Sequence, residues 1–454
     1  MNRAPDYIKD ELLENLCTSY RENNQIRNEL FTRYGVKRGL RNADGTGVLA
    51  GITKLGNVHG YVLNEGEREP IQGRLTYRGY DLFDLIMGFE QEDRFGFEEV
   101  GYLLLCGALP NKSSLLDFQE TIGHERELPD NFTEDVIMRA PSRDIMNKLA
   151  SATLALYSYD PNPDDTSLPN LMRQGVSLMA KFPVIISHAY QAKRRYFDNA
   201  SMYLHVPDFS KSTAENILGL IRSDGVYTHE EATLLDRCLI IHAEHGGGNN
   251  SAFTARVTSS SGTDTYAAIS AAVSSLKGPR HGGANVKVAE MLDDIKENVE
   301  DWEDEEELYA HLCKILRGEA GDGSGLVYGM GHAIYTLSDP RAVILKSAAR
   351  PLAEKKGYLQ EFDLIERIER LTPRAFAEVK GVDKVMCANV DLYSGFVYKM
   401  LDIPREMFTP LFATARIIGW MAHRMEEITT GGRIIRPAYK PLSRRAEYVQ
   451  LNNR

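Results

Sequence analysis

The chain has 454 residues, of which 43% are hydrophobic and 26% charged, and its formal net charge is −11. This composition is ordinary for a globular protein and excludes collagen-like, coiled-coil and disordered chains. Because nucleic acids and anionic membranes attract cationic surfaces, so acidic a chain is a poor general binder of either, and any anion it binds needs a local cationic pocket. The length accommodates one large domain and a smaller one.

The five cysteines lie far apart and form no CxxC pair. This spacing fits neither a zinc cluster nor a disulfide framework, and it favours reduced thiols in a cytoplasmic protein. The first 14 residues carry four acidic side chains and no apolar segment, so we expect no signal peptide. No apolar run reaches the roughly 18 residues of a membrane span.

In chain order, amphipathic spacing predicts a helix over residues 7–34. Residues 44–47 form a turn pattern, and short strands are expected near residues 60–63 and 73–77. Helical patterns then dominate, at residues 97–105, 145–157, 168–193, 228–242, 266–276, 285–291, 293–307, 362–371 and 408–427. Because strands and helices do not alternate, a doubly wound sheet is not expected. The fold class predicted from these patterns is mainly α.

Several histidines sit beside glycines, which let a backbone come close to a ligand. His242 and His245 have the HxxH spacing of a metal pair, but no third ligand is near and Glu244 is not at the position of an HExxH glutamate. We therefore expect no metal site. We interpret His242 as structural and His245, which faces a run of three glycines, as functional.

His281 follows Gly-Pro-Arg and precedes Gly-Gly, at a turn before a helix expected near Asn285. The positive end of a helix dipole keeps an imidazole neutral, which suits hydrogen-bond donation to a carbonyl. His332 is framed by glycines in residues 329–332, and Arg341 follows nine residues later. This segment lacks the third glycine of a dinucleotide-binding fingerprint. For Arg341 alone, a surface salt bridge is the simpler interpretation.

Asp391 lies in a small, uncharged neighbourhood, where capping a helix that starts near Leu392 is as good an interpretation as catalysis. Arg416 lies in the otherwise apolar stretch 410–421. A charge there needs a carboxylate partner from the protein or from a ligand. Arg436 follows in the segment 433–437.

Together these segments resemble the citrate synthase family, of the si type, over residues 39–437. The ordered set of three histidines, an arginine, an aspartate and two arginines carries the resemblance, and residues 75–81 and 102–110 add further matches. The resemblance implies a two-domain helical fold. Its large, dimer-forming domain would comprise residues 1–282 and 403–454, and its small domain, residues 283–402, would close over the active-site cleft.

The resemblance also implies an acyltransferase that converts acyl into alkyl groups, condensing acetyl-CoA with oxaloacetate and water to give citrate and CoA. Asp391 would act as the base, His281 would stabilise the enol, and His332 would polarise the keto group of oxaloacetate. The remaining site residues implied are His245, Arg341, Phe412, Arg416 and Arg436 for oxaloacetate, and Gly329, Gly331 and Lys384 for CoA. Arg436 would reach the neighbouring site of a homodimer. No cofactor is implied beyond the substrates.

The nearest alternative is 2-methylcitrate synthase, which uses propionyl-CoA, because one extra methylene gives only about 1–3 kcal/mol of discrimination. A metal-dependent hydrolase would need acidic ligands beside the histidines, and a chelator would test it. A non-catalytic homologue would be favoured if His281, His332 or Asp391 were replaced, and all three are present. The N-terminus does not resemble the strand-rich extension of NADH-inhibited bacterial enzymes, so inhibition by NADH is not expected.

Overall fold

The computed structural model describes residues 9–64, 67–382 and 385–454, and it is mainly helical. The helices are α1 (Asp10–Asn23), α2 (Glu29–Arg33), α3 (Leu82–Gln91), α4 (Phe97–Cys106), α5 (Lys112–Glu125), α6 (Ile145–Ala155), α7 (Leu168–Phe197), α8 (Thr213–Ile221), α9 (His229–His242), α10 (Asn250–Ser259), α11 (Thr265–Leu276), α12 (Ala284–Asn298), α13 (Glu305–Arg317), α14 (Pro340–Lys356), α15 (Leu359–Lys380), α16 (Asp391–Met400) and α17 (Phe408–Thr429). Most of the helices predicted from sequence are confirmed. None of the described helices combines the length and apolar character that a membrane crossing requires.

The strands β1 (Gly56–Asn64), β2 (Glu67–Tyr77) and β3 (Tyr80–Asp81) form one antiparallel sheet in that order. The register pairs Gly56 with Tyr77 at one end of the hairpin and shifts between His59 and Tyr61. Both strands predicted from sequence are confirmed, and each extends beyond its predicted core.

The described chain divides into two compact units, each with its own internal contacts. The smaller unit comprises the described residues up to Gly51 together with Arg436–Arg454, and the larger comprises Ile52–Ile435. The predicted division into residues 1–282 with 403–454 and residues 283–402 follows other boundaries and stays a prediction.

The predicted helix over residues 7–34 is wrong in extent, because α1 ends at Asn23 and α2 begins only at Glu29. Two asparagines end α1 by satisfying its last carbonyl groups. The Asn23 side chain donates to Ser19 O at 2.8 Å, and the Asn24 side chain donates to Tyr20 O at 3.1 Å. Such local side-chain bonds compete with continued helix. The predicted turn at residues 44–47 is confirmed, since Asp44 accepts from the backbone N–H of Thr46.

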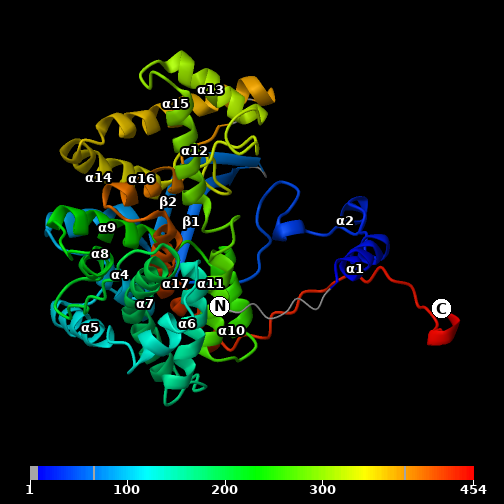
Figure 1. Cartoon of the computed structure of the whole chain (residues 1–454), viewed down its shortest axis with the longest axis horizontal. Helices are drawn as coiled ribbons and strands as arrows, with labels where there is room; N and C mark the ends of the chain where they lie inside the picture. Colours follow the sequence, from blue (N-terminus) through cyan, green and yellow to red (C-terminus); the bar gives the residue numbers. More distant parts are fainter. Residues whose placement is uncertain (1–8, 65–66, 383–384) are drawn as a thin grey trace. The chain divides into compact units, whose positions relative to one another are not determined.

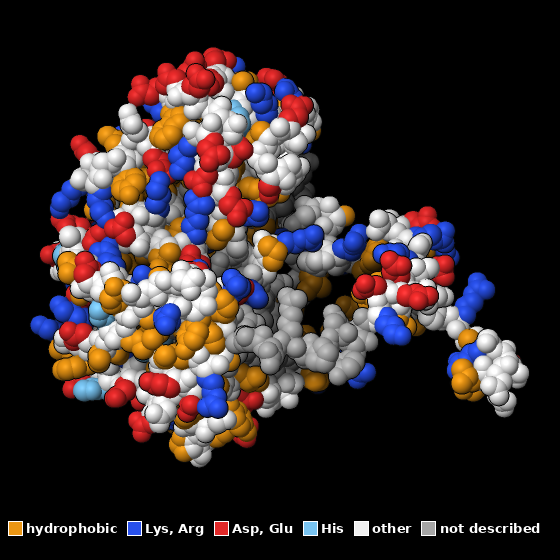
Figure 2. Space-filling model, in the orientation of Figure 1, with side chains coloured by type: hydrophobic (Ala, Val, Ile, Leu, Met, Phe, Trp, Pro, Cys, Tyr) orange, Lys and Arg blue, Asp and Glu red, His pale blue; other side chains and the backbone are white. Residues whose placement is uncertain are grey.

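The predicted helix over residues 293–307 is also wrong, because α12 ends at Asn298 and α13 starts at Glu305. Asp304 caps α13 by accepting from the backbone N–H groups of residues 306 and 307. The Glu307 carboxylate accepts from the N–H groups of residues 300 and 301 and so fixes the connecting loop. Acidic side chains gather on the visible surface of the larger unit at the end that contains α13 (Figures 1 and 2).

Helix α17 forms the centre of the larger unit, with α12–α16 gathered at one end and α4–α11 around its other part (Figure 1). It contacts α4, α7, α9, α10 and α11. Its residues from Phe408 to Met425 are all buried. Because α17 is surrounded by other helices, it is apolar on every face rather than amphipathic. The buried Arg416 and Arg424 are therefore exceptions that need partners.

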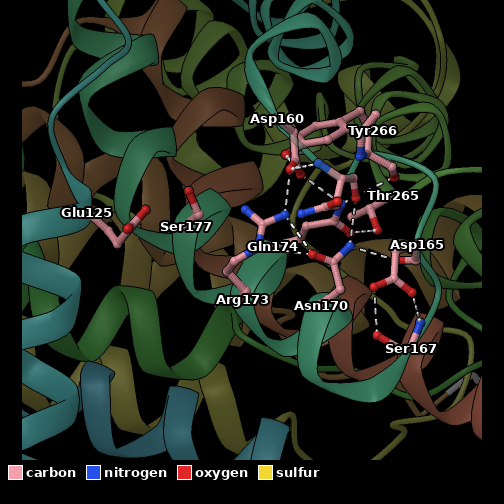
Figure 3. A network of polar contacts seen from close by, with 12 residues as sticks. Glu125, Asp160, Asp165, Ser167, Asn170, Arg173, Gln174, Ser177, Thr265 and Tyr266 are labelled. Atoms are coloured by element: carbon pink, nitrogen blue, oxygen red, sulfur yellow. Dashed lines mark hydrogen bonds and ion pairs between the residues drawn. The ribbon is translucent and has the colours of Figure 1, made fainter.

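A polar network joins the start of α7 to α11 (Figure 3). Asp160 accepts from the Tyr266 hydroxyl at 2.6 Å and from the Gln174 amide at 2.9 Å, and it pairs with Arg173. Gln174 in turn accepts a hydrogen bond from Thr265, the first residue of α11. The network fixes α11, and the turn that follows α11 carries His281.

Candidate active site

Two of the predicted histidines lie side by side with a tyrosine. The ring centroids of His245 and His332 are 5.3 Å apart, and the Tyr335 ring stacks on His332 at 4.7 Å. Burial is the main cause that holds the pKa of His245 well below its usual value, and the charge of Arg341 adds to it. Nε2 of His245 is buried without a hydrogen-bond partner among the described residues. His245 is thus a neutral ring with a free nitrogen inside the site.

The backbone fixes which nitrogen of His332 carries the proton. The N–H groups of Ile334 and Tyr335 point at Nδ1 of His332, at 3.1 and 3.2 Å. Backbone N–H groups only donate, so Nδ1 is the acceptor and the neutral ring carries its proton on Nε2. His332 can therefore donate a hydrogen bond from Nε2.

The glycines before His332 allow a close crossing with the segment before α16. Gly331 N donates to Cys387 O at 2.7 Å, and Asn389 N donates to Gly329 O at 2.8 Å. Gly329 has a φ of +82°, and a Cβ there would lie 2.8 Å from the Leu392 side chain. Gly331 has open space around the corresponding position. The crossing brings His332 and Asp391 toward one another from separate parts of the chain.

His281 has the opposite tautomer to His332, and Ser251 determines it. Ser251 N donates to Nε2 of His281 at 3.3 Å, and the Ser251 hydroxyl lies 3.0 Å from the same nitrogen. With Nε2 as acceptor, the neutral ring carries its proton on Nδ1. Burial, assisted by the charge of Arg416, lowers the pKa of His281 to about 4, so the ring is neutral at physiological pH. The predicted neutral donor is consistent with this geometry.

The interpretation of Arg341 as part of a surface salt bridge is wrong, because the side chain is buried. It forms two hydrogen bonds to one carboxylate, that of Asp339. Its Nε donates to Oδ1 of Asp339 at 3.0 Å, and its Nη2 donates to Oδ2 at 2.7 Å. Asp339 also caps α14 by accepting from Arg341 N. The side chain is held rigidly, with Cζ 5.9 Å from the centroid of the Tyr335 ring.

Arg416 is buried and lies over an aromatic ring, with its Cζ 4.8 Å from the centroid of Phe412, one turn earlier on α17. Its Nε donates to His242 O at 2.6 Å. Within the described residues, neither Nη1 nor Nη2 has a hydrogen-bond partner. Phe412 also contacts the rings of His242 at 4.7 Å and His281 at 6.4 Å. Arg416 therefore presents unused donors beside His281.

Asp391 is the first residue of α16, and its side chain does not cap that helix. The capping interpretation is therefore wrong. Burial raises the pKa of Asp391 to about 6, while the nearby charge of Arg341 opposes the shift and that of Asp339 adds to it. Asn389 holds the backbone in place by accepting from Asp391 N at 3.0 Å. A carboxylate with such a pKa is mostly ionised at pH 7 and is more basic than an exposed one.

The structure thus assembles seven of the predicted residues around one site in the larger unit: His245, His281, His332, Arg341, Asp391, Phe412 and Arg416. The site combines neutral imidazoles, a buried arginine with free donors and a carboxylate of raised pKa. It can bind a carboxylate-bearing ligand, donate hydrogen bonds to two carbonyl oxygens and accept a proton.

Two predicted residues are not part of this assembly as described. Arg436 is exposed and belongs to the smaller unit, so its contribution stays a prediction. Lys384 lies outside the described residues. No group of three or more His, Cys, Asp or Glu side chains with the geometry of a metal site occurs among the residues described.

Sequence reasoning missed several positions that shape the site. Ser251 sets the tautomer of His281, Asp339 holds Arg341, and the Tyr335 hydroxyl is buried without a partner among the described residues. Ser251 lies close after the three glycines that follow His245, and Asp339 lies two residues before Arg341. Their nearness in sequence to predicted site residues was the signal that could have identified them. Tyr335 lies in the same segment as Asp339, between His332 and Arg341, and its position in the sequence offered the same signal.

Comparisons with known proteins give one consistent result. Residues 44–438 match the family model "Citrate synthase, C-terminal domain". The citrate synthase of Corynebacterium glutamicum is 34% identical, over 80% of this chain and 79% of its own length. The 2-methylcitrate synthase 1 of the same organism is 32% identical, over 85% of this chain and 93% of its own length.

Solved structures agree with the sequence relatives. The citrate synthase of Thermoplasma acidophilum, in a ternary complex with carboxymethyl coenzyme A and oxaloacetate, superposes with a TM-score of 0.73. It is 26% identical, covering 92% of this chain and 99% of its own. The citrate synthase of Pyrobaculum aerophilum superposes with a TM-score of 0.71 at 28% identity, covering 89% of this chain and 93% of its own.

Proposed function

Because this chain belongs to the citrate synthase family, we propose that it condenses acetyl-CoA with oxaloacetate and water to give citrate and CoA. The observation that carries the proposal is the position of a carboxylate of raised pKa, Asp391, in one site with two neutral histidines of fixed tautomer. That combination suits removal of a weakly acidic proton from carbon together with stabilisation of the oxygen that becomes negative.

Oxaloacetate, a dianion, would bind first at the arginines. Arg416 offers two unpaired Nη donors, and His245 offers a buried nitrogen without a partner. Arginine pairs with a carboxylate through two parallel hydrogen bonds, which fixes the orientation of the ligand as well as its charge. Arg341, held by Asp339, would supply a second positive charge, and Arg436 of a partner subunit a third. The Nε2–H of His332 would then donate to the keto oxygen.

The condensation would begin with transfer of a methyl proton from acetyl-CoA to the Asp391 carboxylate. The resulting enol oxygen would accept a hydrogen bond from Nδ1–H of His281. Preorganised donors of this kind contribute about 10²–10³ in rate each. The enol carbon would attack the keto carbon of oxaloacetate, whose oxygen would take the Nε2 proton of His332. The methyl proton held by Asp391 would leave to solvent, from which His332 would be protonated again. Water would then cleave the thioester carbon–sulfur bond of citryl-CoA and release CoA as the thiol.

The Gly329–Gly331 segment would lie along the thioester arm of CoA. Gly331 has no atom within van der Waals reach of a Cβ position, which leaves room beside the His332 ring. Lys384 is proposed as a contact to a CoA phosphate. The substrates supply all the reacting groups, so the proposal involves no further cofactor.

A second candidate is 2-methylcitrate synthase, because a relative of that activity is almost as similar as the citrate synthases. The same residues would act on propionyl-CoA, and the two substrates differ by one methylene, worth about 1–3 kcal/mol.

Release of the CoA thiol, followed with a thiol-reactive dye, tests both candidates. Purified protein receives oxaloacetate with acetyl-CoA and, in parallel, with propionyl-CoA. We expect a higher kcat/KM with acetyl-CoA. Preference for propionyl-CoA would assign the second candidate, and no release with either would refute the condensation. Omission of oxaloacetate is the control, because simple thioester hydrolysis would continue without it.

A further inference from the structure

A buried glutamate outside the set of predicted residues lies behind the oxaloacetate site. We propose that Glu244 balances the positive charge of Arg416 without occupying its donors, and thereby limits how tightly the site binds a dianion. The inference rests on the proposed function, since it assumes that Arg416 binds a carboxylate of oxaloacetate.

Glu244 is fully buried between the two histidines of the HxxH segment. Its Oε1 accepts from Gly246 N at 2.5 Å and from Nε2 of His423 at 2.9 Å. Its Oε2 has no partner among the described residues. A carboxylate held by two donors through one oxygen keeps a fixed orientation, while its other oxygen receives no hydrogen bond from the described residues.

Arg416 and Glu244 border the same small space beside α17. A methyl group at Gly419, three residues after Arg416, would lie 2.6 Å from Oε2 of Glu244 and 3.3 Å from Cδ of Arg416. The two charged groups nevertheless form no ion pair in the described structure, and Arg416 donates instead to His242 O. The pair interacts through space rather than through a shared hydrogen bond.

The electrostatics agree with this geometry. Burial lowers the pKa of Arg416 to about 10, and Glu244 is the main group opposing that shift. Burial also works against ionisation of Glu244, yet the pKa of Glu244 stays below its usual value because His423, Arg416 and Gly246 N stabilise the carboxylate. Each charge therefore makes the burial of the other less costly.

His423 is oriented by a chain of groups that leads away from the site. Nε of Arg256, which can only donate, lies 3.0 Å from Nδ1 of His423. The neutral ring therefore carries its proton on Nε2, and this N–H donates a hydrogen bond to Glu244. Arg256 is itself paired with Glu426 and Glu427. Glu244 is thus a positioning residue held by α10 and α17, not a group that touches substrate.

The arrangement has opposite consequences for the empty and the occupied site. In the empty site, Glu244 stabilises the buried Arg416, whose Nη groups stay free for a ligand. In the occupied site, the same charge repels the carboxylates of the ligand. Neutralising Glu244 should therefore destabilise the free protein and strengthen the binding of oxaloacetate.

The test is isothermal titration of oxaloacetate into the whole protein, in the absence of acyl-CoA, for wild type and Glu244→Gln. Glutamine keeps Oε1 as an acceptor for Gly246 and His423, removes the charge and places an amide NH2 where Oε2 stands. We expect the Kd to fall about tenfold, as for a unit charge removed at a separation of several ångströms, and the melting temperature of the free protein to fall.

Two variants serve as matched controls. Glu427→Gln removes the same charge from the far end of the chain of groups and should leave the Kd unchanged. Glu244→Asp keeps the charge and should bind no more tightly than wild type. A merely structural role for Glu244 predicts weaker binding in both Glu244 variants, and that result, or an unchanged Kd in Glu244→Gln, would overturn the inference.

If Glu244→Gln is unfolded without ligand, oxaloacetate must restore its native circular dichroism signal, and failure to do so would also overturn the inference. A wild-type protein that binds no oxaloacetate would refute the proposed function. Tight binding by wild type with no gain in Glu244→Gln refutes the charge-balance inference alone.

Discussion

Replacing Asp391 with asparagine removes the base of the proposed reaction together with an unfavourable buried charge. Burial raises the pKa of Asp391 from its usual value of 3.8 to about 6. Because the folded pKa lies above the unfolded one, ionisation of Asp391 destabilises the folded protein. This destabilisation is absent below pH 3.8 and reaches its full size above about pH 6. At pH 7 the difference between the folded and unfolded pKa of Asp391 lowers the free energy of unfolding by at most about 3 kcal/mol, because the side chain is only half-buried.

Asp391→Asn should therefore be more stable than wild type at pH 7 by up to about 3 kcal/mol, and by about half of that at pH 5. Its turnover should fall by about 10²–10⁴, the usual contribution of a general base. Urea denaturation at the two pH values measures the stability, and thiol release measures the turnover. A stability gain that does not shrink between pH 7 and pH 5 would refute the electrostatic reasoning. Turnover close to wild type would refute the assignment of the base.

Three further outcomes are expected. The kcat/KM should fall about tenfold per pH unit below the Asp391 pKa of about 6, and a profile flat to pH 5 would mean that another group is the base. Gly329→Ala should lose stability by roughly 1–3 kcal/mol, because a Cβ would clash at a φ of +82°. Gly331→Ala shares a positive φ of +84° but its Cβ would meet no atom within 4 Å, so in the same thermal melts it should lose less stability, by the contribution of the clash. Arg436→Ala should raise the KM for oxaloacetate at least about tenfold. Arg433→Ala, at an exposed neighbouring position, should leave this KM unchanged. Equal effects of the two substitutions would refute the contribution of Arg436 to the partner subunit's site.

Much of the fold follows from local sequence patterns, because apolar periodicity and capping residues act over one or two turns. The helix from residue 228 to 242 is an example, since Thr228 and Glu231 form a capping box at its start. The patterns fail where a side chain binds backbone N–H groups and interrupts a helix. The acidic stretch 293–307 has helical composition throughout, yet the Glu307 carboxylate binds the backbone of residues 300 and 301 and divides it.

The residues of the candidate site could be predicted from the sequence, but their tautomers and hydrogen-bond partners could not. Spacing and resemblance indicated which histidines, arginines and aspartate converge. The tautomers of His281 and His332 depend on backbone N–H groups whose positions follow only from the three-dimensional fold. The partnership of Arg341 with Asp339 and the isolation of the Arg416 Nη groups are likewise results of packing. A sequence contains no direct sign of an unpaired donor.

The β1–β2 hairpin meets the loop between His332 and Arg341 at two glycines, where the backbones approach closely. A Cβ at Gly60 would lie 2.7 Å from Ile334 O, and one at Gly73 would lie 2.1 Å from Ser338 O. The loop between His332 and Arg341 therefore rests against the hairpin with no room for any side chain at either glycine. In a saturation-mutagenesis screen for activity, these two positions should tolerate substitution as poorly as the histidines do, although they carry no functional group. A map of intolerant positions would accordingly outline the contact between hairpin and loop as well as the chemistry, and the two kinds of position could be told apart only by measuring folding separately.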